Sequence, residues 1–163
     1  MRGDISARCI VAGCSRNTVS FWILSRTTCP CRPTYTPFED FFQRPPSAQT
    51  KLIWVGQGSV QDVIVDIRHS SPTYGQHLSI ELSANNGFQL LVPSGFAHGF
   101  LTTAPDTMVH YKTNAYYAPE HDIGLLWNDP DLEIKWKCHG DTVVLSERDR
   151  KLTRLKELPP YFP

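Results

Sequence analysis

The sequence has no long hydrophobic run and no net charge, and both absences narrow its function. A helix that crosses a bilayer needs about 20 consecutive apolar residues, and no such run occurs among the 163 residues. The 16 basic and 16 acidic residues cancel, so the overall charge favours neither nucleic acid nor an anionic membrane. The N-terminus lacks the layout of a signal peptide. We expect no nucleic-acid or membrane partner, whereas a small anionic ligand is compatible with a local basic pocket.

The N-terminal residues 1–42 lack both strand alternation and helical periodicity. Four of the five cysteines lie there, and Cys138 is the fifth. A disulfide framework is unusual in a domain of this size, so we expect a reducing compartment, the cytoplasm. We expect residues 1–42 to be an atypical segment that is poorly ordered, because a chain without a hydrophobic pattern cannot offset the cost of ordering. One domain is expected at 43–163.

From residue 43 onward, short runs rich in Val, Ile, Tyr and Phe are separated by Gly, Pro, Asn and Ser. These runs have the length and composition of β-strands, and they cover residues 51–56, 60–68, 77–82, 89–92, 100–103 and 108–113. Many short strands without helical patterns between them predict an all-β fold, an antiparallel jelly roll. Residues 147–158 alone have a helical pattern, which predicts a short C-terminal helix.

One strand has a clear alternation that indicates how it packs. Val63, Val65 and Ile67 alternate with Ile64, Asp66 and Arg68. This pattern suits a strand that is buried on one face.

The segment 87–100 has the glycine, proline and histidine spacing of the second cupin motif, with Pro93, Gly95 and His98 at its centre. A metal cupin also needs an upstream His-x-His and Glu cluster, because a catalytic metal takes about three protein ligands. The first histidine of the chain is His69, and it stands alone. We therefore expect a cupin-like double-stranded β-helix without a metal site.

Several blocks of this sequence follow one another in the order that one known family shows. They are Asp62-Val63-Ile64-Val65-Asp66-Ile67-Arg68, Ser71-Pro72-Thr73-Tyr74-Gly75-Gln76, Pro93-Ser94-Gly95-Phe96-Ala97-His98-Gly99-Phe100, Tyr111-Lys112-Thr113, Tyr116-Tyr117-Ala118-Pro119, Trp127-Asn128-Asp129-Pro130 and Leu145-Ser146-Glu147-Arg148-Asp149. Over residues 43–163 the chain resembles the dTDP-4-dehydrorhamnose 3,5-epimerases. The resemblance implies a cofactor-free isomerase that epimerises a dTDP-bound 4-keto-6-deoxy sugar at C3 and C5 in dTDP-L-rhamnose synthesis.

The implied reaction removes and returns a proton beside a ketone. The site needs a base on one face, a cation or donor near the ketone oxygen, and an acid on the other face. The resemblance places Lys51 beside the ketone oxygen, where an ammonium stabilises the developing oxyanion. It makes Tyr111 the acid, since a phenol with a pKa near ~10 starts protonated. Asp149 corresponds to the aspartate that orients the catalytic histidine.

The resemblance also implies which residues meet the substrate. Tyr117 corresponds to the aromatic residue that stacks on the thymine ring, and Gln43, Asp62 and His98 correspond to residues that line the site. We expect Lys51, Tyr111 and His98 to point into one end of the barrel.

Residue type alone favours a structural alternative for each of these residues. A lone lysine such as Lys51 is usually solvated, a strand tyrosine such as Tyr111 usually packs in the core, and an inward histidine such as His98 is usually hydrogen-bonded. Asp149 stands in a charged run that is typical of a solvated helix start. The resemblance, and not the spacing, carries the assignment of the site.

The catalytic histidine and the diphosphate-binding arginine of the family are missing. The resemblance places them in a Leu-Arg-Gly-Leu-His motif followed by an aromatic residue and Gln, where this chain has Phe38-Glu39-Asp40-Phe41-Phe42-Gln43. Codons for Thr-Leu-Arg-Gly-Leu, read one nucleotide late, can encode Pro-Phe-Glu-Asp-Phe, which stands at positions 37–41. We hypothesise that much of residues 1–42 is a frameshifted or mis-spliced translation. An uninterrupted, conventionally spliced transcript that encodes these residues would exclude this.

Two further functions are open. The missing histidine and arginine favour a catalytically impaired homologue that binds a dTDP-sugar, and a mono-epimerase for another dTDP-deoxysugar is the other alternative. The family forms homodimers partly through N-terminal strands, so the resemblance implies a homodimer that is weakened here.

Overall fold

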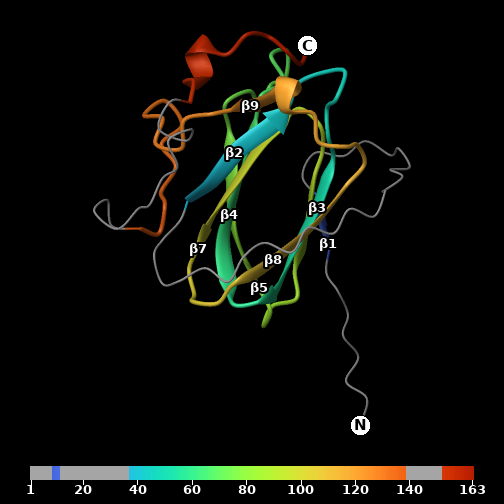
Figure 1. Ribbon diagram of the computed structural model, residues 1–163. Helices are drawn as coiled ribbons and strands as arrows, with labels where there is room; N and C mark the ends of the chain where they lie inside the picture. Colours follow the sequence, from blue (N-terminus) through green and yellow to red (C-terminus); the bar gives the residue numbers. More distant parts are fainter. Residues whose placement is uncertain (1–8, 12–36, 139–151) are drawn as a thin grey trace.

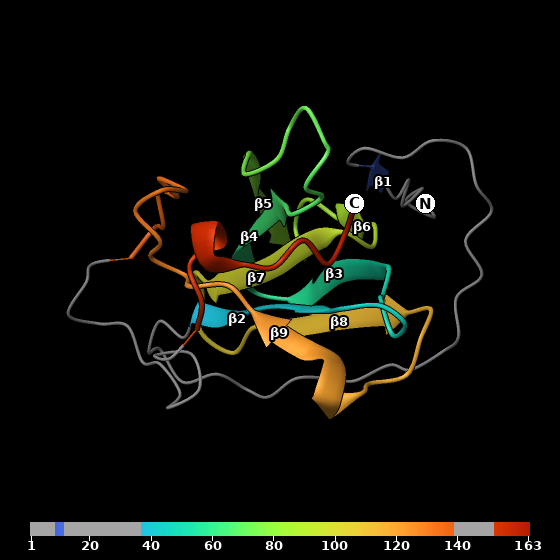
Figure 2. The ribbon, with the colours of Figure 1, turned by 90° about the horizontal axis from the view of Figure 1, so that it is seen from above.

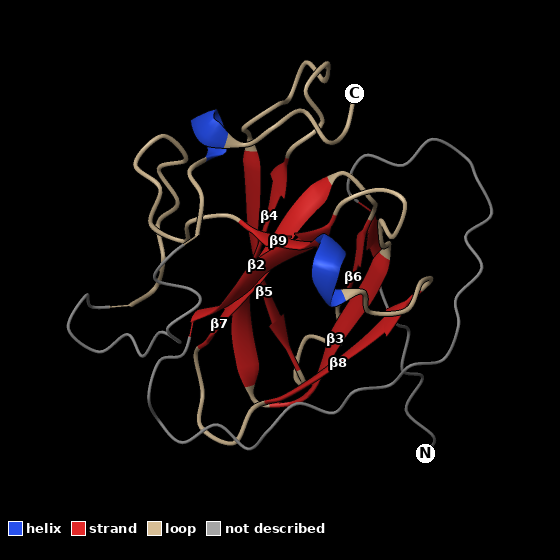
Figure 3. Ribbon diagram, turned by 45° about the horizontal axis from the view of Figure 1, so that its top comes forward, coloured by secondary structure: helices blue, strands red, loops and turns tan. Residues whose placement is uncertain are grey.

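The computed structural model describes residues 9–11, 37–138 and 152–163, with side chains from Phe42 onward. Its strands are β1 (Cys9–Val11), β2 (Pro37–Gln43), β3 (Lys51–Gln57), β4 (Ser59–Asp66), β5 (His77–Ser83), β6 (Gln89–Val92), β7 (Phe96–Thr102), β8 (Met108–Thr113) and β9 (Asp122–Gly124). Two short 3-10 helices, η1 (Pro119–His121) and η4 (Leu155–Glu157), appear as the blue turns of Figure 3. No helix among the described residues is long and apolar enough to cross a membrane.

The strands form two facing sheets, with orders β1-β6-β3-β8 and β5-β4-β7-β2-β9. Figure 1 shows β4 and β7 in one layer and β3 and β8 in the other, and Figure 2 gives the view from above. Every strand pairing in the described residues is antiparallel except that of β1 with β6. The expected antiparallel jelly roll is confirmed. We call the end at which β2, β4 and β8 finish and β3, β7 and β9 begin the upper end (top in Figure 1).

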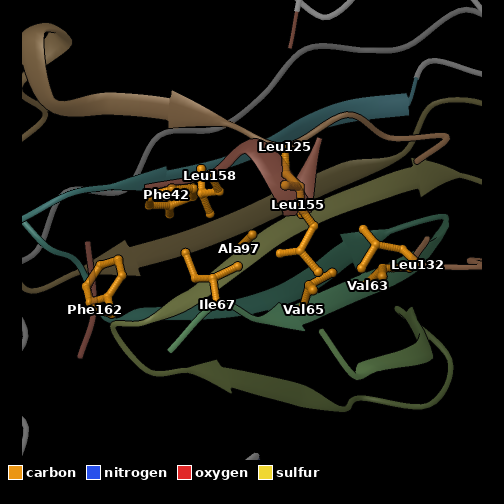
Figure 4. Packing of buried hydrophobic residues seen from close by; sticks show 10 residues of the cluster. All are labelled: Phe42, Val63, Val65, Ile67, Ala97, Leu125, Leu132, Leu155, Leu158 and Phe162. Carbon is orange, nitrogen blue, oxygen red and sulfur yellow. The ribbon is translucent and has the colours of Figure 1, made fainter. Parts of the chain in front are cut away.

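Two hydrophobic cores hold the sandwich together. The core between the sheets comprises Ile53, Val55, Val60, Ile64, Leu82, Leu90, Val92 and Val109. The second core lies on the outer face of the five-stranded sheet, where the C-terminal segment covers it (Figure 4), and comprises Phe42, Val63, Val65, Ile67, Ala97, Leu125, Leu132, Leu155, Leu158 and Phe162. Residues of β4 contribute alternately to both cores. The prediction that this strand is buried on one face is therefore wrong, because the C-terminal segment covers the face that would otherwise be solvated.

Most of the predicted strands are present with small shifts at their ends. Those expected at 51–56, 60–68, 77–82, 89–92 and 108–113 correspond to β3, β4, β5, β6 and β8. The strand expected at 100–103 starts earlier, at Phe96, and sequence analysis missed β1, β2 and β9.

Two boundaries differ from the expectations. The sheet begins upstream of residue 43, because β2 pairs with both β7 and β9. The helix expected at 147–158 is reduced, within the described residues 152–158, to the single turn η4, since Thr153 instead bridges to Leu125. Residues 147–151 lie outside the described part of the chain.

Candidate functional site

Lys51 and Tyr111 lie on the inner face of the four-stranded sheet, close to the upper end. In the pairing of β3 with β8, Lys51 stands opposite Thr113 and Ile53 opposite Tyr111. Directly paired residues share a face of the sheet, as do alternate residues of one strand. Ile53 belongs to the core between the sheets, and the Tyr111 ring packs against that core. Both predicted side chains therefore face the interior, Lys51 at the rim and Tyr111 one pair deeper.

His98 faces the same interior from the opposite sheet. It pairs with Ile64, another residue of the inner core. Its Nε2 lies 3.0 Å from each carboxylate oxygen of Asp62. Because a carboxylate only accepts hydrogen bonds, Nε2 donates and Nδ1 is the nitrogen that accepts in a neutral ring. The expected inward direction of Lys51, Tyr111 and His98 is confirmed, while their roles stay predictions.

Asp62 is fully buried, with an exposed fraction of 0%. A substrate-binding role is predicted for this residue, and its carboxylate binds the His98 ring. Asp62 thereby fixes the orientation of the imidazole, while its role toward a substrate stays a prediction.

The position before Phe42 lies next to His98 in the sheet. In β2, Phe41 pairs with His98 of β7 on one side and with Gly124 of β9 on the other. The family motif has its histidine directly before an aromatic residue and Gln, the pair that here is Phe42-Gln43. If the resemblance holds at this position, the family histidine corresponds to residue 41, whose backbone adjoins that of His98.

Tyr117 and Gln43 lie together at the upper end. The Tyr117 side chain is 58% exposed, and its hydroxyl donates a hydrogen bond of 2.8 Å to Asp122 Oδ2. Gln43 is 3% exposed, and its amide bonds to the backbone of the neighbouring loops instead of facing outward. An exposed ring on a tethered loop suits the predicted stacking role of Tyr117.

An ionic network around the buried carboxylate of Asp66, at the same end, was missed by sequence analysis. Arg68 binds Asp66 through Nε at 2.9 Å and Nη2 at 2.6 Å, and Ser71 and Thr73 donate hydroxyl hydrogen bonds to Oδ2 of the same carboxylate. Burial alone would raise the pKa of Asp66, but these hydrogen bonds outweigh it and hold the pKa well below its usual value. The guanidinium in turn lies 4.7 Å from the centre of the Phe96 ring.

This network holds the start of β7 and the loop after β4 together, and both segments lie at the upper end. The signal that pointed to it was present in the sequence: an Asp-x-Arg at the end of a buried strand, followed within a few residues by Ser and Thr. Hydroxyl and guanidinium donors of this kind commonly satisfy a buried carboxylate.

Two further expectations concern residues outside this geometry. Asp149 lies outside the described residues, so the structure says nothing of its predicted role. Among the described residues, no three His, Cys, Asp or Glu side chains gather as a metal site would require.

Comparison with known proteins gives the family. A family model described as dTDP-4-dehydrorhamnose 3,5-epimerase matches residues 41–157. The chain is 51% identical to the enzyme of that name from Sinorhizobium fredii over 121 residues, which are 74% of this chain and 62% of the relative. The Escherichia coli enzyme is 44% identical over 117 residues, 72% of this chain and 63% of the relative. The chain thus spans about three fifths of the length of the curated relatives it matches.

Solved structures agree. The Bacillus anthracis epimerase with TDP and PPi bound has a TM-score of 0.79 and 46% identity, covering 85% of this chain and 77% of that one. The Legionella pneumophila epimerase in complex with dTDP-4-keto-L-rhamnose has a TM-score of 0.82 and 33% identity, covering 90% and 76%. The 3'-monoepimerase ChmJ of Streptomyces bikiniensis with dTDP-quinovose has a TM-score of 0.74 and 26% identity, covering 82% and 66%.

The relatives and the solved structures that share this jelly roll are epimerases of dTDP-linked sugars. The chain belongs to the dTDP-4-dehydrorhamnose 3,5-epimerase family.

Proposed function

We propose that the chain takes a dTDP-linked 4-keto-6-deoxy sugar at its upper end, in a site built to epimerise C3 and C5, and that it lacks the base for this reaction. The observation that carries the proposal is the shared inner face of Lys51 and Tyr111. The first supplies a cation and the second a phenolic proton, and together they meet two of the three needs of the reaction.

The proposed chemistry follows from the acidity of a C–H bond beside a ketone. A base removes the proton, and the electron pair moves onto the ketone oxygen to give an enolate. The Lys51 ammonium stabilises that oxyanion, and Tyr111 returns a proton to the opposite face of the carbon, which inverts its configuration. The Asp62–His98 pair lines the opposite wall, where a buried carboxylate keeps the imidazole in one orientation.

Without a histidine before Phe42, proton removal has no dedicated base in this proposal. General-base catalysis contributes typically ~10²–10⁴-fold, so we expect turnover near background for the chain as written. Because the diphosphate-binding arginine of the family is also missing, we expect a lower affinity for the diphosphate.

An exchange experiment in D2O tests which carbons react. The variant to use is a repaired chain, in which Thr-Leu-Arg-Gly-Leu-His replaces residues 37–41, so that a histidine again precedes Phe42. NMR of the recovered sugar nucleotide should show deuterium at both C3 and C5. A repaired chain that binds dTDP but incorporates no deuterium would overturn the proposed function.

A second candidate is epimerisation at a single carbon, which the structural similarity to a 3'-monoepimerase favours. Deuterium at C3 alone in the same spectrum would select it.

The proposal extends to assembly and location. Family dimers use N-terminal strands, and this chain departs from the family there, so we propose a weakened homodimer. Cys138, the cysteine whose side chain the structure describes, is a free thiol, which is compatible with a reducing cytoplasm.

A further inference from the structure

We propose that Gln43 is a positioning residue that holds the segment 115–118 and thereby presents the Tyr117 ring to the nucleotide. The inference rests on the proposed function, because it takes Tyr117 as the residue that stacks on the base. It assigns Gln43 a different role from the direct substrate contact that the sequence suggested.

The amide of Gln43 is engaged on both sides by the protein itself. Its Nε2 donates to the backbone oxygens of Ser47 at 3.0 Å and Tyr116 at 3.2 Å. Its Oε1 accepts from the backbone N–H of Ala118. An amide nitrogen has two N–H donors, and both are used here. A substrate group would have to displace one of these bonds, which leaves a buried polar group without its partner.

These bonds bracket Tyr117 in the sequence. Gln43 binds the carbonyl of the residue before Tyr117 and the N–H of the residue after it, so the backbone of the tyrosine is held on both sides. The Tyr117 hydroxyl donates to Asp122 Oδ2, and Asp122 is itself paired with Gln43 in the β2–β9 ladder. Gln43 thus holds the backbone on both sides of Tyr117, while the Tyr117 hydroxyl is bound by Asp122, the strand neighbour of Gln43.

A second glutamine supports the same segment from the loop after β2. Gln49 donates through Nε2 to the carbonyls of Ala115 at 2.9 Å and Tyr116 at 3.2 Å. Gln49 reaches only the N-terminal side of the tyrosine, whereas Gln43 reaches both sides. Loss of Gln43 therefore frees the backbone of Tyr117 while Gln49 still keeps the segment close to the barrel.

The consequence is specific to nucleotide affinity. A stacking ring that is ordered before binding adds its full contact energy, whereas a mobile ring loses part of it to ordering. Lys51 and Tyr111 lie on other strands, β3 and β8, and do not depend on this tie. Removal of Gln43 should raise the Kd for dTDP and the KM of an active chain, and should leave kcat nearly unchanged.

Gln61 provides a matched control for the loss of a buried glutamine. Like Gln43 it is 3% exposed. It donates to Ser79 Oγ and to the Lys135 carbonyl and accepts from the Lys137 N–H. The two residues therefore share their burial and their bonding pattern, but Gln61 holds the segment 135–137, far in the sequence from Tyr117.

The test is calorimetric titration of the full chain and of four variants with dTDP, alongside thermal unfolding. Gln43→Met should raise the Kd about tenfold, close to the effect of Tyr117→Ala, since a base–aromatic stack is worth about that factor or more. Gln61→Met should leave the Kd within about twofold of the parent, even if it lowers Tm by the same amount.

Gln43→Glu is a second substitution at the same residue, in case Gln43→Met does not fold. It retains the acceptor for Ala118 but cannot donate to the carbonyls of Ser47 and Tyr116, so an intermediate Kd is expected. An unaltered Kd in both Gln43 variants, beside a weakened Tyr117→Ala, would overturn the inference. An equal loss in Gln61→Met would also overturn it, by showing a general loss of stability. Absence of dTDP binding by the parent chain would instead contradict the proposed function.

Discussion

Tyr111 is the residue whose hydroxyl matters most in the proposed reaction, because its ring packs against the inner core and its oxygen supplies the proton. In the repaired chain, Tyr111→Phe keeps the packing and removes the acid. Product formation should fall by about 10²–10⁴-fold, while solvent exchange at the carbon that loses its proton should fall less. Parallel measurement of epimerised product and deuterium content separates the two steps.

Tyr74 gives the control for this substitution. Its hydroxyl donates to the Leu155 carbonyl at 3.4 Å, in contact with the outer core. Tyr74→Phe should leave both product formation and exchange unaltered. If Tyr111→Phe behaves in the same way, Tyr111 is a packing residue and not the acid.

Asp66 should make stability depend on pH. Its pKa in the folded chain is lowered, below the value of about 3.9 for the unfolded chain. A lowered carboxyl pKa stabilises the fold above the unfolded value, and this contribution is lost as pH falls through the folded pKa. Asp66→Asn should therefore cost about 2–3 kcal/mol at pH 7, and the difference from the parent should shrink below about pH 4.

Urea unfolding at pH 7 and at successively lower pH measures this dependence. Asp106→Asn is the control, since Asp106 is exposed and its φ of 51° is a conformation that Asn adopts readily. A difference between Asp66→Asn and the parent that stays constant down to pH 3 would show that the carboxylate charge is not the source of the stability.

The identity of the site residues followed from sequence to different degrees. The inward direction of Lys51 and Tyr111 could be expected from the resemblance, and the pairing of β3 with β8 places both on one face. The partners of Asp62 and Gln43 could not be predicted, since each depends on a side chain or backbone group brought close by strand pairing over 36 and 73 residues of sequence.

At the scale of elements, a buried carboxylate adds to the contacts that hold the C-terminal segment on the barrel. Asp129 is 3% exposed, and it accepts hydrogen bonds from the backbone N–H of Asp131 at 3.0 Å and of Leu155 at 2.7 Å. Asp129→Ala leaves two N–H donors without this partner and should cost about 1–3 kcal/mol. Hydrogen exchange should speed up first in the amides of residues 152–162.

Asp131→Ala is the matched change in the same turn. The Asp131 carboxylate is half exposed and lies 3.9 Å from Lys156 Nζ, and exposed pairs of this kind contribute little. Stability should change by less than about 0.5 kcal/mol. Equal exchange rates at Leu155 in both variants would show that the carboxylate of Asp129 does not anchor the segment.

Strands were predicted correctly where β-branched and aromatic residues dominate. They were missed where a segment becomes a strand only because it pairs with neighbouring strands. The N-terminal half of β7 contains Ala97 and Gly99, which have low strand propensity, and it forms because β4 and β2 flank it. β9 has only three residues and ends in Gly124, too few for a pattern. The helical pattern around Leu152, Leu155 and Leu158 was misleading, because Leu155 and Leu158 pack on the outer core from the single 3-10 turn η4 and the residue after it.

At the scale of the whole molecule, we expect a weak dimer. The family model matches residues 41–157, and the proposed dimer contact involves the N-terminal part, where the chain departs from the family. Sedimentation of the chain at micromolar concentration should give mainly monomer, and the repaired chain should associate no more tightly, because its repair is confined to residues 37–41. A tight dimer of the chain as written would contradict this expectation.

In the proposed reaction the chain supplies a cation, Lys51, and an acid, Tyr111, but lacks a base. The most direct measurement compares deuterium uptake from D2O into the 4-keto sugar nucleotide by the chain as written and by the repaired chain, at equal concentration. Uptake should be near background for the first and about 10²–10⁴-fold faster for the second. Equal and rapid uptake by both would contradict it, and loss of that uptake in His98→Gln would then identify His98 as the base.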